Sequence, residues 1–165
     1  TGWKLGESAT LSWKLDMSGR NLQSVPDFVI SRQSLVVLNL SGNLLEQLPA
    51  EISLLVNLVE LRVERNSLFD LPPELSDVPL LQTINLSHNV FRDFPPVLLS
   101  MPSLREIKLD DNHLTSVPIE DLVEASTLER LSLTNNPLTP APADRAPAVL
   151  SGTEEQEPPA SEGAE

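Results

Sequence analysis

Histidine, serine and aspartate are the residues of this chain whose side chains are suited to catalysis. His88 lies one repeat of 23 residues before Asp111, and Ser87 and Ser132 are nearby hydroxyl groups. A histidine beside a serine and a carboxylate would suggest acyl transfer by an activated hydroxyl. The chain has no cysteine and only two histidines, too few for a typical metal site. Whether the catalytic groups could meet depends on the elements that carry them.

The charge of the chain excludes several classes of partner. The 165 residues include 24 acidic and 11 basic ones, for a net charge of −13. Nucleic acids and anionic membranes need clustered Lys and Arg, so neither is expected as a partner. The longest apolar runs are only a few residues, so we expect no transmembrane span. Without cysteine there is no disulfide framework, which fits a cytoplasmic protein.

A repeat of 23 residues, once 24, organises most of the chain. Its pattern is L-x-x-L-x-L-x-x-N-x-L, and a less regular first copy, SWKLDMSGRNL, covers residues 12–22. The five regular copies are LVVLNLSGNLL (35–45), LVELRVERNSL (58–68), LQTINLSHNVF (81–91), LREIKLDDNHL (104–114) and LERLSLTNNPL (128–138). The fourth and sixth positions are apolar with a polar residue between them, which predicts a short strand with one buried face. A single copy cannot bury its own leucines, so the copies must stack into a solenoid.

Two further positions of the repeat predict how each turn is built. Asparagine at the ninth position, as in Asn43 and Asn89, offers donors and an acceptor to buried backbone groups. The first copy has Arg20 there, so its contribution to a ladder of asparagines is doubtful. A proline follows each turn, as in Leu48-Pro49, and predicts the first residue of a short α- or 3₁₀-helix. The fifth copy has one extra residue near 121–122, predicting a small bulge.

The chain ends differ from the repeats in composition. Residues 141–165 have six acidic residues and one basic residue and little to bury except Val149 and Leu150. Such a segment is expected to be disordered. We therefore predict an N-terminal capping segment at 1–11, a repeat domain at 12–142 and an acidic tail rich in Pro, Ala and Glu at 143–165.

The repeat pattern resembles the leucine-rich repeat superfamily, in its short cytosolic type with a Leu-Pro motif. The resemblance covers about residues 12–140, and residues 84–138 are also similar to one small leucine-rich-repeat-containing protein. It implies an α/β solenoid of about six repeats, with a curved parallel sheet on the concave face and short helices or 3₁₀ turns on the convex face. It further implies a monomeric, non-catalytic module that binds a protein partner on the concave face, without a cofactor.

The positions between the buried leucines identify two candidate binding patches on the concave face. The first has mixed charge and consists of Arg62, Glu64, Arg65, His88, Lys108, Asp110 and Asp111. The second is apolar and consists of Trp13, Val36, Val37 and Val59. Complementary charges would select a partner at the first patch, and a buried Trp would anchor one at the second.

Each patch has a simpler interpretation. The charged patch is equally consistent with a solvated surface on which Arg65, His88 and Asp111 pair along one row. The apolar patch would be covered if Trp3, Leu5 and Leu11 folded back as a cap. At the other end, Val149 and Leu150 are the candidates to cover the last strand.

Two alternative functions use other features of the same face. The motifs Asn39-Leu40-Ser41 and Asn85-Leu86-Ser87 match the N-glycosylation signal, as in an extracellular receptor fragment. We interpret them instead as products of the repeat pattern. An enzyme would need a ligand-sized pocket at His88 and Asp111, which an open sheet is not expected to provide.

Overall fold

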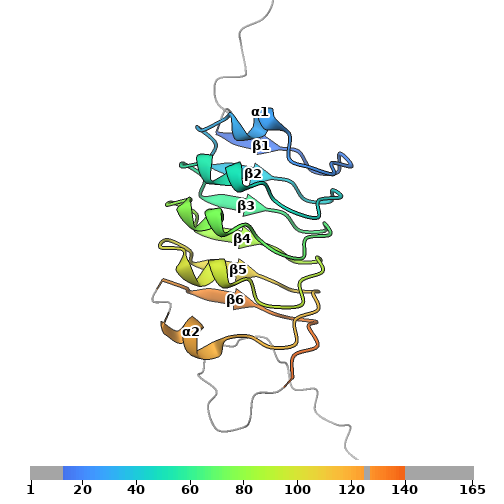
Figure 1. Cartoon of the computed structure of the whole chain (residues 1–165), viewed down its shortest axis with the longest axis vertical. Helices are drawn as coiled ribbons and strands as arrows, with labels where there is room; N and C mark the ends of the chain where they lie inside the picture. Colours follow the sequence, from blue (N-terminus) through green and yellow to red (C-terminus); the bar gives the residue numbers. More distant parts are fainter. Residues whose placement is uncertain (1–12, 125–126, 140–165) are drawn as a thin grey trace, which may run out of the picture.

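The computed structural model describes residues 13–124 and 127–139, and these form a single stack of repeats. Six strands alternate with five short helices along the chain (Figure 1). The strands are β1 (Lys14–Asp16), β2 (Val37–Asn39), β3 (Glu60–Arg62), β4 (Thr83–Asn85), β5 (Glu106–Lys108) and β6 (Arg130–Ser132). The helices are α1 (Asp27–Ile30), the 3₁₀ helices η1 (Ala50–Leu54), η2 (Pro73–Asp77) and η3 (Pro96–Ser100), and α2 (Ile119–Glu124).

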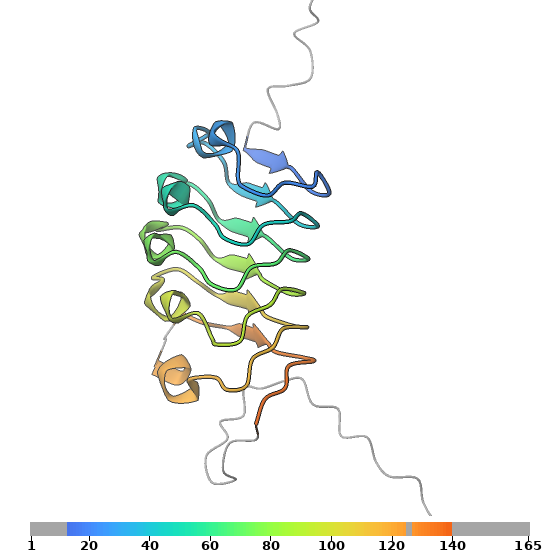
Figure 2. The same ribbon diagram turned by 45° about the vertical axis from the view of Figure 1, so that its right-hand side comes forward.

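The strands form one parallel sheet in the order β1-β2-β3-β4-β5-β6. Leu15, Leu38, Leu61, Ile84, Ile107 and Leu131 are successive partners in its register. The helices stack in a second column on the other side of the core (Figure 2). This arrangement confirms the predicted solenoid of about six repeats. We call the sheet surface that faces away from the helices the concave face.

The core is a continuous column of leucine, isoleucine, valine and phenylalanine between the sheet and the helices. Leu38, Leu61 and Ile84 are fully buried, whereas the residues on either side of them in each strand remain partly or fully exposed. The alternation expected from the sequence is therefore present in every central strand. From the helix side, Ile52 and Leu75 complete the column and are also fully buried.

The regular spacing of asparagine along the chain produces a ladder of hydrogen bonds that joins neighbouring repeats. Asn66 Oδ1 accepts the backbone N–H of Leu45 in the preceding repeat, and its Nδ2 donates to the carbonyls of Leu40 and Val63. Asn43, Asn89, Asn112 and Asn136 make the same kind of bonds. Each asparagine bonds to backbone groups of the preceding repeat, so Asn43 bonds to those of the first repeat. Arg20 in that repeat therefore leaves the ladder intact.

The prolines lie one residue earlier than predicted. Pro26, Pro49, Pro72 and Pro95 occupy the N-cap position with extended backbone angles, so the prediction of a first helical position was wrong. The carbonyl of each of these four prolines accepts the backbone N–H of the third residue of its helix. Proline fixes φ near −65°, which suits this extended cap as well as the helix that follows. The extra residue of the fifth repeat accompanies the six-residue α2 in place of a five-residue 3₁₀ helix.

The last repeat is less well buried than the central ones. Leu131 and Leu133 are half-buried, although their equivalents in the four preceding repeats are nearly inaccessible. The predicted capping residues Trp3, Leu5, Leu11, Val149 and Leu150 lie outside the described residues, as does the acidic tail. None of the described helices is both long and apolar enough to cross a membrane.

Candidate functional site

The strands and the turns that follow them place the predicted charged patch on the concave face. Residues 62 and 108 end β3 and β5, and residues 64, 65, 88, 110 and 111 belong to the turns beyond β3, β4 and β5. Parallel strands lie about 4.8 Å apart, so equivalent residues of adjacent repeats are neighbours. The structure thus brings the seven residues of the charged patch onto three adjacent repeats.

The charges of strands β3 and β5 are paired within each strand. Arg62 Nε lies 2.6 Å from Glu60 Oε1, and Lys108 Nζ lies 3.4 Å from Glu106 Oε1. The hydrogen bond from Glu60 raises the pKa of Arg62 above its ordinary value. Because both pairs are partly exposed, they contribute little to stability. They do, however, leave these four charges less available to a partner.

Asparagine or aspartate at the end of a strand caps the turn that follows it, a role that the sequence analysis missed. Asn39 Oδ1 accepts both the N–H and the hydroxyl of Ser41, and Asn85 Oδ1 accepts the N–H of Ser87. Asp16 does the same for Ser18. The signal was present as Asp or Asn followed two positions later by Ser. This capping role explains why Asn-x-Ser recurs in the repeats without any need for glycosylation. Asp16, at the equivalent position of the first repeat, makes the same bonds to Ser18.

The capping bond in the first repeat predicts a pH effect. The hydroxyl of Ser18 and then its N–H, at 2.6 and 2.9 Å, hold the pKa of Asp16 below its ordinary value of 3.8. The carboxylate therefore stabilises the fold above about pH 4, and this contribution is lost as the pH falls through the lowered pKa. We expect Ser18→Ala to raise the pKa of Asp16 toward 3.8 in an NMR titration. Ser53→Ala, which removes a hydroxyl bonded to a backbone carbonyl, is the control and should leave that pKa unchanged.

A groove of about 740 Å³ runs along the turns at the ends of the strands. We call it the turn groove. Its lining residues are Ser18, Gly19, Ser41, Gly42, Glu64, Arg65, Asn85, Ser87, His88, Asp110, Asp111 and Thr134. The groove is wide open to solvent and does not enclose a ligand, as expected of an open sheet. Gly19 and Gly42 contribute no side chain at the eighth position of the first two repeats, which leaves the groove wider at that end.

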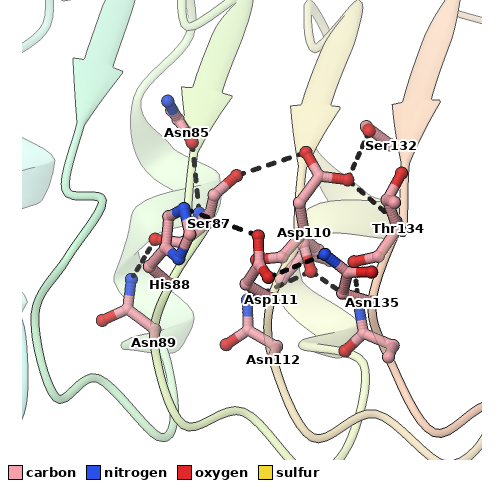
Figure 3. A network of polar contacts seen from close by, with 12 residues as sticks. Asn85, Ser87, His88, Asn89, Asp110, Asp111, Asn112, Ser132, Thr134 and Asn135 are labelled. Atoms are coloured by element: carbon pink, nitrogen blue, oxygen red, sulfur yellow. Dashed lines mark hydrogen bonds and ion pairs between the residues drawn. The ribbon is translucent and has the colours of Figure 1, made fainter.

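Inside the turn groove, the serine and histidine side chains bind different carboxylates (Figure 3). His88 Nε2 lies 3.4 Å from Asp111 Oδ2, whereas the Ser87 hydroxyl donates to Asp110 Oδ2 at 3.5 Å. Asp110 Oδ1 also accepts the Ser132 hydroxyl at 2.5 Å. Within the described residues no hydrogen bond joins a serine to His88. The groove thus lacks the contact by which a histidine would activate a serine.

The predicted row of paired charges is present only in part. His88 pairs with Asp111, and Asn135 Nδ2 donates to Asp111 Oδ1 at 2.9 Å. Arg65 is different, because no carboxylate of the described residues lies within ion-pair distance of it. The prediction that Arg65 joins this row was wrong.

The residues of this row share an unusual backbone conformation. Gly19 and Gly42 have φ values of 63° and 65°, and Arg65, His88, Asp111 and Asn135 have values of 53–57°. Asparagine, aspartate and histidine are enriched in this left-handed region, but arginine is not. Arg65 therefore occupies a position that the first two repeats give to glycine.

Replacing Arg65 with glycine should stabilise the protein. We expect Arg65→Gly to raise the free energy of unfolding by about 0.5–1 kcal/mol, because glycine tolerates positive φ. Arg62→Gly is the matched control, since residue 62 lies in a strand, where glycine is unfavourable by roughly 0.5–1 kcal/mol. Urea unfolding would measure both. Destabilisation by Arg65→Gly would contradict the expectation.

The apolar patch is also assembled by the sheet, at its N-terminal end. The N–H of Val36 donates to the carbonyl of Trp13, and the N–H of Val59 donates to the carbonyl of Val36. Val36, Val37 and Val59 are half-buried and Trp13 is 40% exposed. Lys14 Nζ lies 4.3 Å from the centre of a Trp13 ring. Trp13, Val36 and Val59 thus lie immediately before β1, β2 and β3, and Val37 is the first residue of β2.

Comparisons with known proteins agree with the repeat architecture. Family models described as leucine-rich repeat match residues 34–55, 56–114 and 79–138. No curated protein matches the chain, so the resemblance of residues 84–138 to one small protein stays a prediction.

Several solved structures are similar to the chain. A leucine-rich repeat protein of Leptospira interrogans is 33% identical with a TM-score of 0.73, and the match covers 78% of this chain and 32% of that one. The leucine-rich repeat domain of a Shigella effector is 28% identical with a TM-score of 0.59, covering 79% and 53%. An internalin of Listeria monocytogenes, 22% identical with a TM-score of 0.61, covers 71% and 34% and supports the fold alone. The chain thus spans between a third and about half of these proteins.

Proposed function

Because the chain belongs to the leucine-rich repeat family, we propose that it is a non-catalytic interaction module that binds a protein partner on its concave face. A repeat solenoid presents an extended surface made of equivalent positions, which suits it to recognition of another chain. The sheet face and the turn groove together supply that surface here. Side chains from all six repeats contribute to it.

The distribution of charge is the observation that carries this proposal. Of the nine Lys and Arg residues among residues 13–124 and 127–139, five lie on the concave face or in the turn groove, together with six of the seventeen acids. The remaining surface has four basic and eleven acidic residues. The concave side is thus nearly neutral, with both signs interspersed, whereas the rest of the domain is strongly acidic. Mixed charge on one face favours a specific protein partner over general repulsion.

Affinity capture with two charge-matched variants tests which face is used. Arg62→Glu with Lys108→Glu reverses two basic residues of the concave face, and Arg32→Glu with Arg92→Glu reverses two exposed basic residues elsewhere. Both variants change the net charge equally. We expect the concave variant to lose partners that the wild type and the control retain. Loss in the control alone would overturn the proposal, and circular dichroism would verify that both variants fold.

We also propose a cytoplasmic location rather than an extracellular receptor fragment. Asn39 and Asn85 are half-buried and use their Oδ1 atoms to cap turns. A glycan on either residue would cover the concave face. Secretory expression followed by mass spectrometry tests this, and occupied glycans at Asn39 or Asn85 would favour the receptor alternative.

A hydrolase is the alternative function, because a serine and a histidine both line the turn groove. This alternative has a direct test. Ser87 and His88 line the groove, but their side chains bind Asp110 and Asp111 rather than each other. We expect no covalent labelling by a fluorophosphonate probe and no ester hydrolysis above that of Ser87→Ala. Labelling of the wild type that Ser87→Ala abolishes would establish the enzyme instead.

A further inference from the structure

Most charged side chains on and beside the concave face already have a partner within the domain. The ion pairs are Glu60 with Arg62, Glu106 with Lys108 and Glu129 with Arg105, and His88 contacts Asp111. Asp16 accepts a hydrogen bond from Ser18 in its own turn, and Asp110 accepts from Ser132 and Thr134 of the next repeat. Lys14 lies over Trp13. Apart from Arg130 on the last strand, Glu64 and Arg65 are left without a side-chain hydrogen bond or ion pair to the described residues. They are adjacent in the turn after β3, near the middle of the sheet.

Glu64 has a buried carboxylate oxygen that lacks a donor. Its Oε2 atom is buried and accepts no hydrogen bond from the described residues. Unsatisfied buried oxygens are rare because each one gives up its hydration without compensation. Glu64 also lines the turn groove, next to the open end formed by Gly19 and Gly42. Arg62 is near enough to interact electrostatically with Glu64, but a lysine or arginine of a partner would supply the missing hydrogen-bond donor.

Arg65, in contrast, lacks an acceptor carboxylate among the described residues. It is exposed, has a φ of 56° and has no carboxylate of the described chain within ion-pair distance. Arg65 thus has an unfavourable left-handed backbone conformation, although its side chain makes no ion pair with the described residues. Strain of this kind is concentrated at functional sites. The planar guanidinium suits a carboxylate of a partner, which it can bind through two parallel hydrogen bonds.

We propose that Glu64 and Arg65 determine specificity on the concave face by recognising a linear protein segment with a basic residue within one or two positions of an acidic one. The basic side chain donates to the carboxylate of the half-buried Glu64, and the acidic side chain accepts from Arg65. The backbone of the segment lies in the turn groove, which the missing side chains of Gly19 and Gly42 make accessible. This inference rests on the proposed function of the face.

Selection from a phage-displayed library of random linear 12-residue peptides tests the inference with a defined probe. Selected peptides should pair Lys or Arg with a nearby Asp or Glu. Their Kd should rise about tenfold or more with E64Q/R65Q, because a buried charge contact is lost. The control E60Q/R62Q removes one acid and one base from the same repeat, but from a pair that is already satisfied. It should change Kd by less than about threefold.

Further variants separate this inference from the proposed function. The exchange E64R/R65E should lose the original peptides while the domain keeps its circular dichroism spectrum. If E64Q/R65Q leaves Kd unchanged but Arg62→Glu with Lys108→Glu abolishes binding, the concave face binds peptides by other residues and the inference is wrong. If neither E64Q/R65Q nor Arg62→Glu with Lys108→Glu changes Kd, or if no peptide is selected, both proposals fail. R65G should weaken peptide binding while raising the urea midpoint, which a purely structural role for Arg65 does not predict.

Discussion

Asn89→Ala is expected to destabilise the protein by about 3–5 kcal/mol, because it leaves several buried backbone groups without partners, each worth roughly 1–3 kcal/mol. Asn89 Oδ1 accepts the N–H of Leu68 at 2.9 Å, and its Nδ2 donates to the carbonyls of Val63 and Leu86 at 3.1 and 3.0 Å. These bonds join the backbone of two successive repeats. Alanine can replace none of them, and the cavity is too well enclosed for bulk water to do so easily. Urea unfolding would measure the loss.

A second asparagine provides the control for this prediction. Asn57 is exposed and makes one inter-repeat bond, from its Nδ2 to the carbonyl of Gln33 at 2.8 Å. Asn57→Ala should cost less than about 1 kcal/mol, since water can replace its bond. Equal losses for the two variants would show that the buried ladder is not what holds the repeats together.

Leu61→Ala is expected to cost about 2–5 kcal/mol, as is usual for truncation of a fully buried leucine. Leu61 lies in the middle of β3, in register with Leu38 and Ile84, and is completely inaccessible to solvent. Because neighbouring repeats cover it on both sides, the cavity left by alanine cannot collapse easily. The shift of the urea midpoint would measure this cost.

The equivalent residue of the last repeat gives a matched comparison. Leu131 occupies the same position in β6 but is only half-buried. Leu131→Ala should therefore cost roughly 1–2 kcal/mol, in proportion to the smaller area removed from water. If Leu131→Ala proved as costly as Leu61→Ala, the C-terminal edge would be covered by part of the chain beyond residue 139.

The candidate site was predicted less completely than the fold. The pattern anticipated the pair formed by His88 and Asp111, which the structure confirms. That the charged patch binds a partner stays a prediction. It did not anticipate the turn groove, because the depth of the groove depends on how six turns align in space. It also missed the capping role of Asn39 and Asn85, although the spacing of Asp or Asn to Ser contained the signal. The interpretation of these motifs as products of the repeat was sound, but its physical basis came from the structure.

The amino-acid sequence alone determined the architecture of this protein, because a strict period of leucine and asparagine has only one way to bury every copy. The same period assigned each residue to the core, the concave face or a turn, since equivalent positions of stacked repeats share an environment. Only the tertiary structure decided which charges neutralise one another and which remain available. Ion pairing depends on side-chain reach and direction across neighbouring strands, and the repeat pattern does not encode either. That is why Arg65, expected to pair along its row, was found without a carboxylate among the described residues, beside a buried oxygen of Glu64 that lacks a donor.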